Sequence, residues 1–109
     1  MITQALATDG TSAGATVDVS SSHEGFAVQF LGIAGGGTYK LESSLDGGTT
    51  WLDITKSFVD LSVGTLLAAD VSANTLCVIQ VPIPGLFRIL ATHTGTGTPK
   101  AIIGSSSLS

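Results

Sequence analysis

A hydroxyl, an imidazole and a carboxylate stand close together in the segment Ser21, Ser22, His23 and Glu24. A catalytic triad uses these residue types for nucleophilic attack and proton transfer. Triads, however, are assembled from residues that lie far apart in the sequence and are brought together by a rigid scaffold. Four adjacent residues cannot take up that geometry. We therefore interpret this segment as a solvated loop.

The other candidates for chemistry are isolated. His93 lies at the end of a predicted strand and has no partner that the sequence identifies. Cys77 is the only cysteine, so no intrachain disulfide is possible, and its apolar neighbours predict a buried thiol that acts as a small hydrophobic group. Two histidines and one cysteine this far apart match no zinc spacing, and the acidic residues do not cluster as in a calcium loop.

Two glycine-rich segments do not qualify as phosphate-binding loops. No helix is predicted after residues 32–37, and residues 95–97 lack the lysine and the helix N-terminus of a P-loop. No opposed pair of carboxylates for glycoside cleavage can be identified either. The sequence therefore predicts no enzyme activity, no metal site and no cofactor.

One local motif is specific. Residues 44–51 read Ser-Leu-Asp-Gly-Gly-Thr-Thr-Trp and resemble an Asp-box, in which five positions are defined: Ser44, Asp46, Gly48, Thr50 and Trp51. We expect Asp46 to accept hydrogen bonds from backbone N–H groups of the turn and Gly48 to supply an unusual backbone angle. Trp51 is expected to return into the core and anchor the loop by its apolar area.

A sialidase, in which Asp-boxes recur on propeller blades, does not fit this chain. A propeller needs several blades, and the sequence contains one box. A single arginine cannot form the arginine cluster that binds a sialic acid carboxylate. The five positions of the box are therefore interpreted as a structural turn.

The elements that position these residues are predicted to be strands. Apolar and polar residues alternate with a period of two from position 16 onward. Residues 56–70 are ambiguous, and we favour a strand over 58–63. The sequence predicts one all-β domain over 16–109, a β-sandwich or jelly roll of seven to eight antiparallel strands. Residues 1–15 are expected to form an extended N-terminal arm, or a first strand of uncertain pairing.

The composition is poor in charge. Charged residues make up 11% of the chain, against about 25% in soluble domains, while the mean hydropathy is +0.49. A compact monomer of this mass exposes about 5,600 Å², so few charges protect a large surface against association. Burial of part of that surface between subunits is the simplest remedy, and we expect a homo-oligomer.

Charge and hydropathy also limit the partners. The net charge of −4 disfavours nucleic-acid binding, and the basic residues Lys40, Lys56, Arg88 and Lys100 are too scattered to follow a phosphate backbone. No apolar run reaches 18 residues, so no membrane helix is expected. Residues 1–15 do not resemble a signal peptide, which predicts synthesis in a cytoplasm without export by a cleaved leader.

The sequence around the box resembles a segment of small virion proteins of tailed bacteriophages. In that pattern a strand ending in Gly and a loop precede Gly-Thr-x-x-x-Glu-x-Ser and an Asp-Gly-Gly-x-Thr-Trp turn. Those places are occupied here by Gly37-Thr38, Glu42, Ser44 and residues 46–51. Residues 81–89 resemble a later strand pair, in which a Gly-x-Phe-Arg turn introduces an outward arginine. The resemblance covers roughly residues 26–105.

This resemblance implies a phage structural protein of β-sandwich or jelly-roll type, located in the virion. A capsid decoration (cement) protein fits best. Such proteins commonly sit as trimers on the head shell and hold neighbouring copies of the major capsid protein together. The arm at residues 1–15 is expected to dock on a neighbour by strand addition.

Two alternatives remain open at the level of the sequence. A tail or baseplate module has the same length and the same turn pattern. A carbohydrate-binding β-sandwich module is the alternative from another class, and its sugar platform would be formed by Tyr39 and Trp51 at the two ends of one hairpin.

Overall fold

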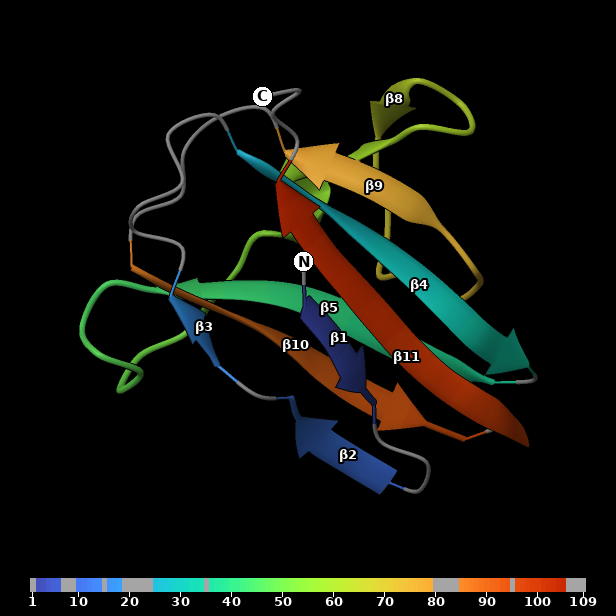
Figure 1. Cartoon of the computed structure of the whole chain (residues 1–109), viewed down its shortest axis with the longest axis horizontal. Helices are drawn as coiled ribbons and strands as arrows, with labels where there is room; N and C mark the ends of the chain where they lie inside the picture. Colours follow the sequence, from blue (N-terminus) through green and yellow to red (C-terminus); the bar gives the residue numbers. More distant parts are fainter. Residues whose placement is uncertain are drawn as a thin grey trace.

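The chain folds almost entirely into strands in the computed structural model, which describes residues 2–6, 10–14, 16–18, 25–34, 36–79, 85–94 and 96–105 (Figure 1). Its elements are β1 (Ile2–Ala5), β2 (Gly10–Ala13), β3 (Val17–Asp18), β4 (Phe26–Ala34), β5 (Gly37–Ser44), β6 (Leu52–Asp53), the 3-10 helix η1 (Thr55–Ser57), β7 (Val59–Asp60), β8 (Thr65–Leu66), β9 (Leu76–Ile79), β10 (Leu86–His93) and β11 (Thr96–Ser105). Among the described residues no helix is long and apolar enough to cross a membrane.

The strands form two antiparallel sheets. We name the six-stranded sheet, in the order β1-β11-β4-β9-β7-β8, the first sheet. The second sheet has the order β2-β10-β5-β6, with β3 also paired to β10. In Figure 1, β11 of the first sheet passes in front of β5 and β10 of the second. The predicted all-β, sandwich-like fold is confirmed.

One hydrophobic core lies between the sheets. On β4, Phe26, Val28 and Phe30 are buried, and the inward side chains of β5 and β10 face them. The ring centroids of Phe26 and Phe87 lie 4.8 Å apart in an edge-to-face arrangement, so aromatic packing joins β4 to β10 across the core. The total exposed surface is 5782 Å², close to the value of about 5,600 Å² expected for a monomer of this mass.

The N-terminal segment differs from the expected arm. β1 pairs with β11 and β2 pairs with β10, while Gln4 and Leu6 are buried. The described parts of residues 1–15 therefore belong to both sheets, as the alternative of a first strand allowed, and β1 and β2 each lie at the edge of a sheet. Small and polar residues give a weak strand signal. The pairing partners, β10 and β11, lie some 80 to 100 positions later, so local patterning does not reveal the pairing.

Residues 56–70 contain the end of a helical turn and a hairpin, and only Val59–Asp60 of the predicted strand over 58–63 is a strand. Asp60 Oδ1 accepts hydrogen bonds from the backbone N and the hydroxyl of Ser62, and Gly64 N donates to the Asp60 carbonyl oxygen. This tight turn ends β7 after two residues and returns the chain as β8.

Residues 71–75 connect the two sheets along one side. Tyr39 and Val71 exchange backbone hydrogen bonds, and so do Phe30 and Thr75. Because Tyr39 lies on β5 and Phe30 on β4, this segment joins one strand of each sheet. It thereby leads the chain from β8 past the edge of β5 into β9.

Candidate functional site

The turn between β5 and β6 is organised by the carboxylate of Asp46. Asp46 Oδ1 accepts hydrogen bonds from the hydroxyl of Ser44 (2.8 Å) and from the backbone N of Thr49 (3.1 Å) and Thr50 (2.8 Å). The bond from Thr50 N is the largest of the effects that lower the pKa of Asp46 from 3.8 to about 2. The carboxylate is solvent-exposed, and its hydrogen bonds from the backbone N–H groups of Thr49 and Thr50 stabilise the turn.

Gly48 and Trp51 complete this turn. Gly48 has a φ of +95°, its N–H donates to Ser44 Oγ at 3.0 Å, and its carbonyl oxygen accepts from Trp51 Nε1 at 2.9 Å. The structure thus brings together Ser44, Asp46, Gly48 and Trp51, while Thr50 contributes its backbone N–H.

The expected burial of Trp51 in the core is wrong. Its side chain is half-buried on the outer side of the second sheet, where the Cζ atom of Arg88 lies 4.2 Å from the ring centroid. Arg88 alternates with the buried Phe87 and Ile89, so it must point away from the core. The indole therefore stacks against an outward arginine, a cation–π contact.

Arg88 is also the partner of Glu42. The two residues face each other in the pairing of β10 with β5, and Arg88 Nε donates to Glu42 Oε1 at 2.8 Å. Both side chains are largely shielded from water, with exposed fractions of 23% for Arg88 and 11% for Glu42. The pair links the Trp51 turn to the middle of the second sheet.

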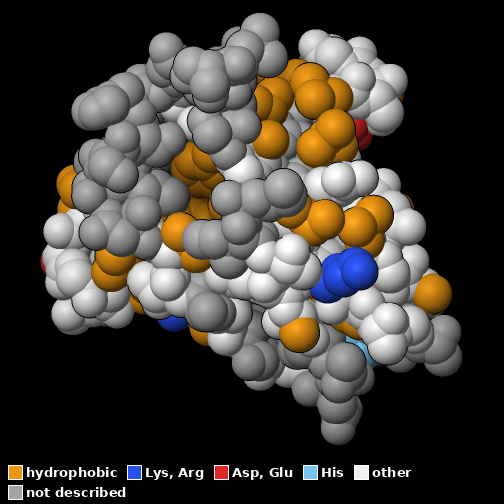
Figure 2. Space-filling model, viewed as in Figure 1, with side chains coloured by type: hydrophobic (Ala, Val, Ile, Leu, Met, Phe, Trp, Pro, Cys, Tyr) orange, Lys and Arg blue, Asp and Glu red, His pale blue; other side chains and the backbone are white. Residues whose placement is uncertain are grey.

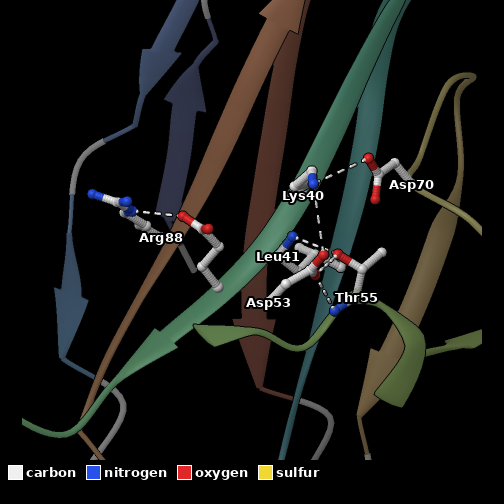
Figure 3. A network of polar contacts seen from close by, with 7 residues as sticks. Lys40, Leu41, Asp53, Thr55, Asp70 and Arg88 are labelled. Atoms are coloured by element: carbon white, nitrogen blue, oxygen red, sulfur yellow. Dashed lines mark hydrogen bonds and ion pairs between the residues drawn. The ribbon is translucent and has the colours of Figure 1, made fainter. Parts of the chain in front are cut away.

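A second charged group lies beside it. Lys40 Nζ lies 3.9 Å from Asp53 Oδ2 on β6 and 3.8 Å from Asp70 Oδ2, and Figure 3 shows its ammonium between the two carboxylates. Thr55 Oγ1 donates to Asp53 Oδ1 at 2.6 Å and accepts from Leu41 N at 2.9 Å. These contacts tie β6, η1 and the segment before Val71 to β5.

Burial of Asp53 raises its pKa, but the hydrogen bonds from Thr55 Oγ1 and N, together with Lys40 and Lys56, outweigh that effect, so the net pKa is lowered. The ionised carboxylate is thus the form that holds these contacts. The outer face of the second sheet carries five charged side chains that are paired with one another: Lys40, Glu42, Asp53, Asp70 and Arg88.

The outer face of the first sheet carries fewer charges than that of the second, where Leu86 and Leu90 also lie beside the charges. Side chains that alternate with its core residues point outward, and paired residues share a face. The register places aliphatic residues on that face, which we call the apolar face, with the polar Thr3 and Gln29 among them: Leu31, Val59, Leu61, Leu66, Leu76 and Ile102. Figure 2 shows apolar side chains gathered over β9 and β4 in this view. Among the described residues, Lys100 is the one charged side chain that the register places there.

The candidates for chemistry are placed as follows. Cys77 is buried, as predicted, and burial is the main reason that its pKa is raised to about 12, with a smaller effect from the charge of Asp60. His93 is buried at the end of β10, with its Nδ1 3.2 Å from the hydroxyl of Tyr39. The segment with His23 and Glu24 lies outside the described residues. No group of three or more metal-ligating side chains occurs in the described part of the chain.

The sugar platform of Tyr39 and Trp51 is wrong. Tyr39 is fully buried and contacts Phe30 with ring centroids 5.9 Å apart, whereas Trp51 lies outside the core. All four phenylalanines are buried as well. The sequence pattern placed Tyr39 near the hairpin but gave no sign of its buried partner, His93, which lies 54 residues away.

Comparisons with known proteins agree with this fold. The chain matches no protein-family model and no curated protein sequence. Its structure is similar to the crystal structure of the SPBc2 prophage-derived protein YomS, with a TM-score of 0.68 and 14% sequence identity over 94% of this chain and 90% of that one. At this level of identity the similarity shows a shared fold.

Proposed function

We propose that this chain is a structural protein of a tailed-bacteriophage particle, a capsid decoration protein that oligomerises and binds the major capsid protein on the head shell. The observation that carries the proposal is the exposure of large apolar side chains on a chain with few charges: Leu61, Leu66 and Leu76, in or beside the first sheet, are 51%, 59% and 42% exposed. The second sheet presents paired charges, with the half-buried Leu86 and Leu90 on the same outer face. Exposed apolar side chains suit a protein that is partly covered by protein contacts.

The core supports a subunit that folds by itself and is then added to the shell, in preference to a subunit that shares strands with its neighbours. Both sheets supply residues to one core within a single chain, and the exposed area has the size expected of a monomer. Only twelve acidic and basic side chains share that 5782 Å². A subunit that is complete by itself, yet weakly protected by charge, fits a protein that is added to a preformed shell in many copies, where repetition multiplies modest contacts.

The similarity to a prophage-derived protein is consistent with a phage origin. Its fold, together with the turn pattern at residues 44–51, supports placement among virion proteins of β-sandwich type. A trimeric state, common in decoration proteins of this type, is part of the proposal.

The test is the copy number in purified particles. Quantitative mass spectrometry of virions from the strain that carries the gene would compare this chain with the major capsid protein, and cryo-microscopy would locate it. Hundreds of copies at regular positions on the shell are expected. A few dozen copies confined to the tail would replace decoration by a tail or baseplate role, and absence from the particles would overturn the virion assignment.

A further inference from the structure

We infer that Asp46–Gly47 is a modification site, at which the chain converts itself to isoaspartate when the turn between β5 and β6 opens. The reaction needs no reactant other than water. The inference goes beyond the proposed function and does not depend on it. It rests on the sequence of the turn and on the hydrogen bonds that Asp46 accepts there.

An aspartate followed by glycine favours this reaction, because glycine has no Cβ that hinders its backbone nitrogen. The chain contains two such pairs, Asp9–Gly10 and Asp46–Gly47, whereas each of the other four aspartates precedes a valine, an isoleucine or a leucine. Asp9 lies outside the described residues. Asp46 and Gly47 are both exposed, so water has access to the second pair.

The reaction begins with ring closure inside the Asp46–Gly47 pair. The backbone nitrogen of Gly47 attacks Cγ of the protonated Asp46 carboxyl group, a new N–C bond replaces the C–OH bond, and the amide proton leaves with the hydroxyl group as water. The resulting succinimide then takes up one water molecule. Addition of water at the backbone carbonyl carbon leaves the chain joined through Cγ, which is isoaspartate, whereas addition at Cγ restores aspartate.

The closed turn protects Asp46 from this reaction. Asp46 Oδ1 accepts hydrogen bonds from Ser44 Oγ, Thr49 N and Thr50 N, and ring closure has to turn the carboxyl group away from these donors. These bonds, that from Thr50 N first, also lower the pKa of Asp46 from 3.8 to about 2, so the protonated carboxyl is about 10- to 100-fold rarer at neutral pH. The reaction therefore proceeds through local opening of the turn.

Isoaspartate prevents the turn from closing again. It inserts one additional carbon atom into the main chain between residues 46 and 47 and leaves the free carboxylate bonded directly to Cα. A carboxylate in that position no longer reaches Thr49 N and Thr50 N as the side chain of Asp46 does. The hydrogen bond from Trp51 Nε1 to the Gly48 carbonyl oxygen belongs to the same turn, so the modification is expected to release the indole as well.

Two serines offer a matched pair of variants for the test. Ser44 Oγ donates to Asp46 Oδ1 at 2.8 Å, and Ser62 Oγ donates to Asp60 Oδ1 at 2.8 Å in the turn between β7 and β8. Ser44→Ala removes a bond that holds the reacting aspartate, whereas Ser62→Ala makes the same change at an aspartate that precedes a leucine. The chains would be kept for weeks at neutral pH, folded and in urea. Mass spectrometry with electron-transfer fragmentation, which distinguishes the two isomers, would measure isoaspartate at each position.

In urea, Asp46 and Asp9 are expected to form isoaspartate at similar rates, because no fold holds either residue. In the folded wild type and in Ser62→Ala, the rate at Asp46 should be lower by about tenfold or more, and Ser44→Ala should raise it several-fold. If circular dichroism shows that Ser44→Ala is misfolded, Trp51→Phe, which removes the bond to the Gly48 carbonyl oxygen, takes its place.

Three results would overturn the inference: equal rates at Asp46 in the folded and the unfolded wild type, no acceleration in a folded turn variant, or no isoaspartate at Asp46 in urea. None of them touches the virion role, which copy number in particles decides separately.

Discussion

Glu42 and Arg88, 46 residues apart in the sequence, face each other across β5 and β10 and are joined by a 2.8 Å hydrogen bond. Arg88 also lies over the ring of Trp51, so one side chain connects the sheet to the turn that follows β5. The outer face of the second sheet is therefore held by polar contacts, whereas the inner face is held by packing.

Removal of Arg88 is expected to destabilise the fold. Arg88→Met should lower the free energy of unfolding by about 1–2 kcal/mol, because Glu42 then stays largely shielded without its partner. The sole tryptophan should also become more exposed, and its fluorescence emission should shift to the red. Denaturant unfolding followed by fluorescence measures both effects.

The double variant Glu42→Gln/Arg88→Met is the control for that prediction, because the neutral amide no longer leaves a shielded charge. The double variant should lose less unfolding free energy than the sum of the losses in the two single variants, Glu42→Gln and Arg88→Met. Additive effects would show that the pair does not interact.

The stability of the turn at Asp46 should depend on pH within a defined acidic range. Because the folded pKa is about 2 against the ordinary 3.8, the carboxylate stabilises the turn above about pH 4, and this contribution is lost as the pH falls toward 2. The protection of the Thr49 and Thr50 amides, which is their exchange rate by NMR relative to the intrinsic rate at the same pH, should fall over this range. In Asp46→Asn the protection should already be lower at neutral pH, and a wild-type turn whose amide protection does not change between pH 4 and 2 would contradict the assignment.

The hydroxyl of Tyr39 should stabilise the core through His93. Tyr39→Phe is expected to cost about 1–3 kcal/mol, because the buried His93 Nδ1 loses its partner at 3.2 Å. Thr11→Val, which removes an exposed hydroxyl contact to Thr92, should cost far less. Thermal denaturation compares the two, and equal losses would argue against a buried polar pair.

Tyr39 should also make stability sensitive to alkali. Burial raises the pKa of its phenol above the ordinary value of 10.0, so the contribution is complete below pH 10 and is lost as the pH rises through the folded pKa. Tyr39→Phe should remove the part of this dependence that comes from the phenol, while the part that comes from the buried thiol of Cys77, whose pKa is raised to about 12, should remain. Absorbance of the phenolate, recorded with stability against pH, provides the measurement.

Gly47 and Gly85 both have a positive φ angle, but substitution by alanine should affect stability differently at the two positions. Gly47 (φ +75°) has open space where a Cβ would stand, whereas at Gly85 (φ +87°) the Cβ would overlap the carbonyl oxygen of Ser44. Gly47→Ala should cost about 1–2 kcal/mol from the backbone alone. Gly85→Ala should cost about 1–3 kcal/mol more, because the backbone of the turn has to move. Equal melting temperatures for the two variants would contradict this account.

Much of the fold could be predicted because strands with one buried face leave a period of two in the chain. Phe26, Val28 and Phe30, and again Phe87, Ile89 and Ala91, are buried as their alternation indicates. The hairpin at 60–64 was missed because its turn depends on the Asp60 carboxylate and on Gly64, amid apolar residues that also suit a strand. The pairing of β1 and β2 was left open because their partners lie near the other end of the chain.

The sequence by itself determined that this is an all-β domain with an aromatic core, few charges and a tight turn around Asp46. Only the tertiary structure decided that Trp51 lies under Arg88, that Tyr39 meets His93, and that the paired charges gather on the outer face of the second sheet. The physical reason is that alternation assigns each residue to a side of its own strand. The neighbours on that side come from other strands, and their order in the sheet is set by long-range pairing.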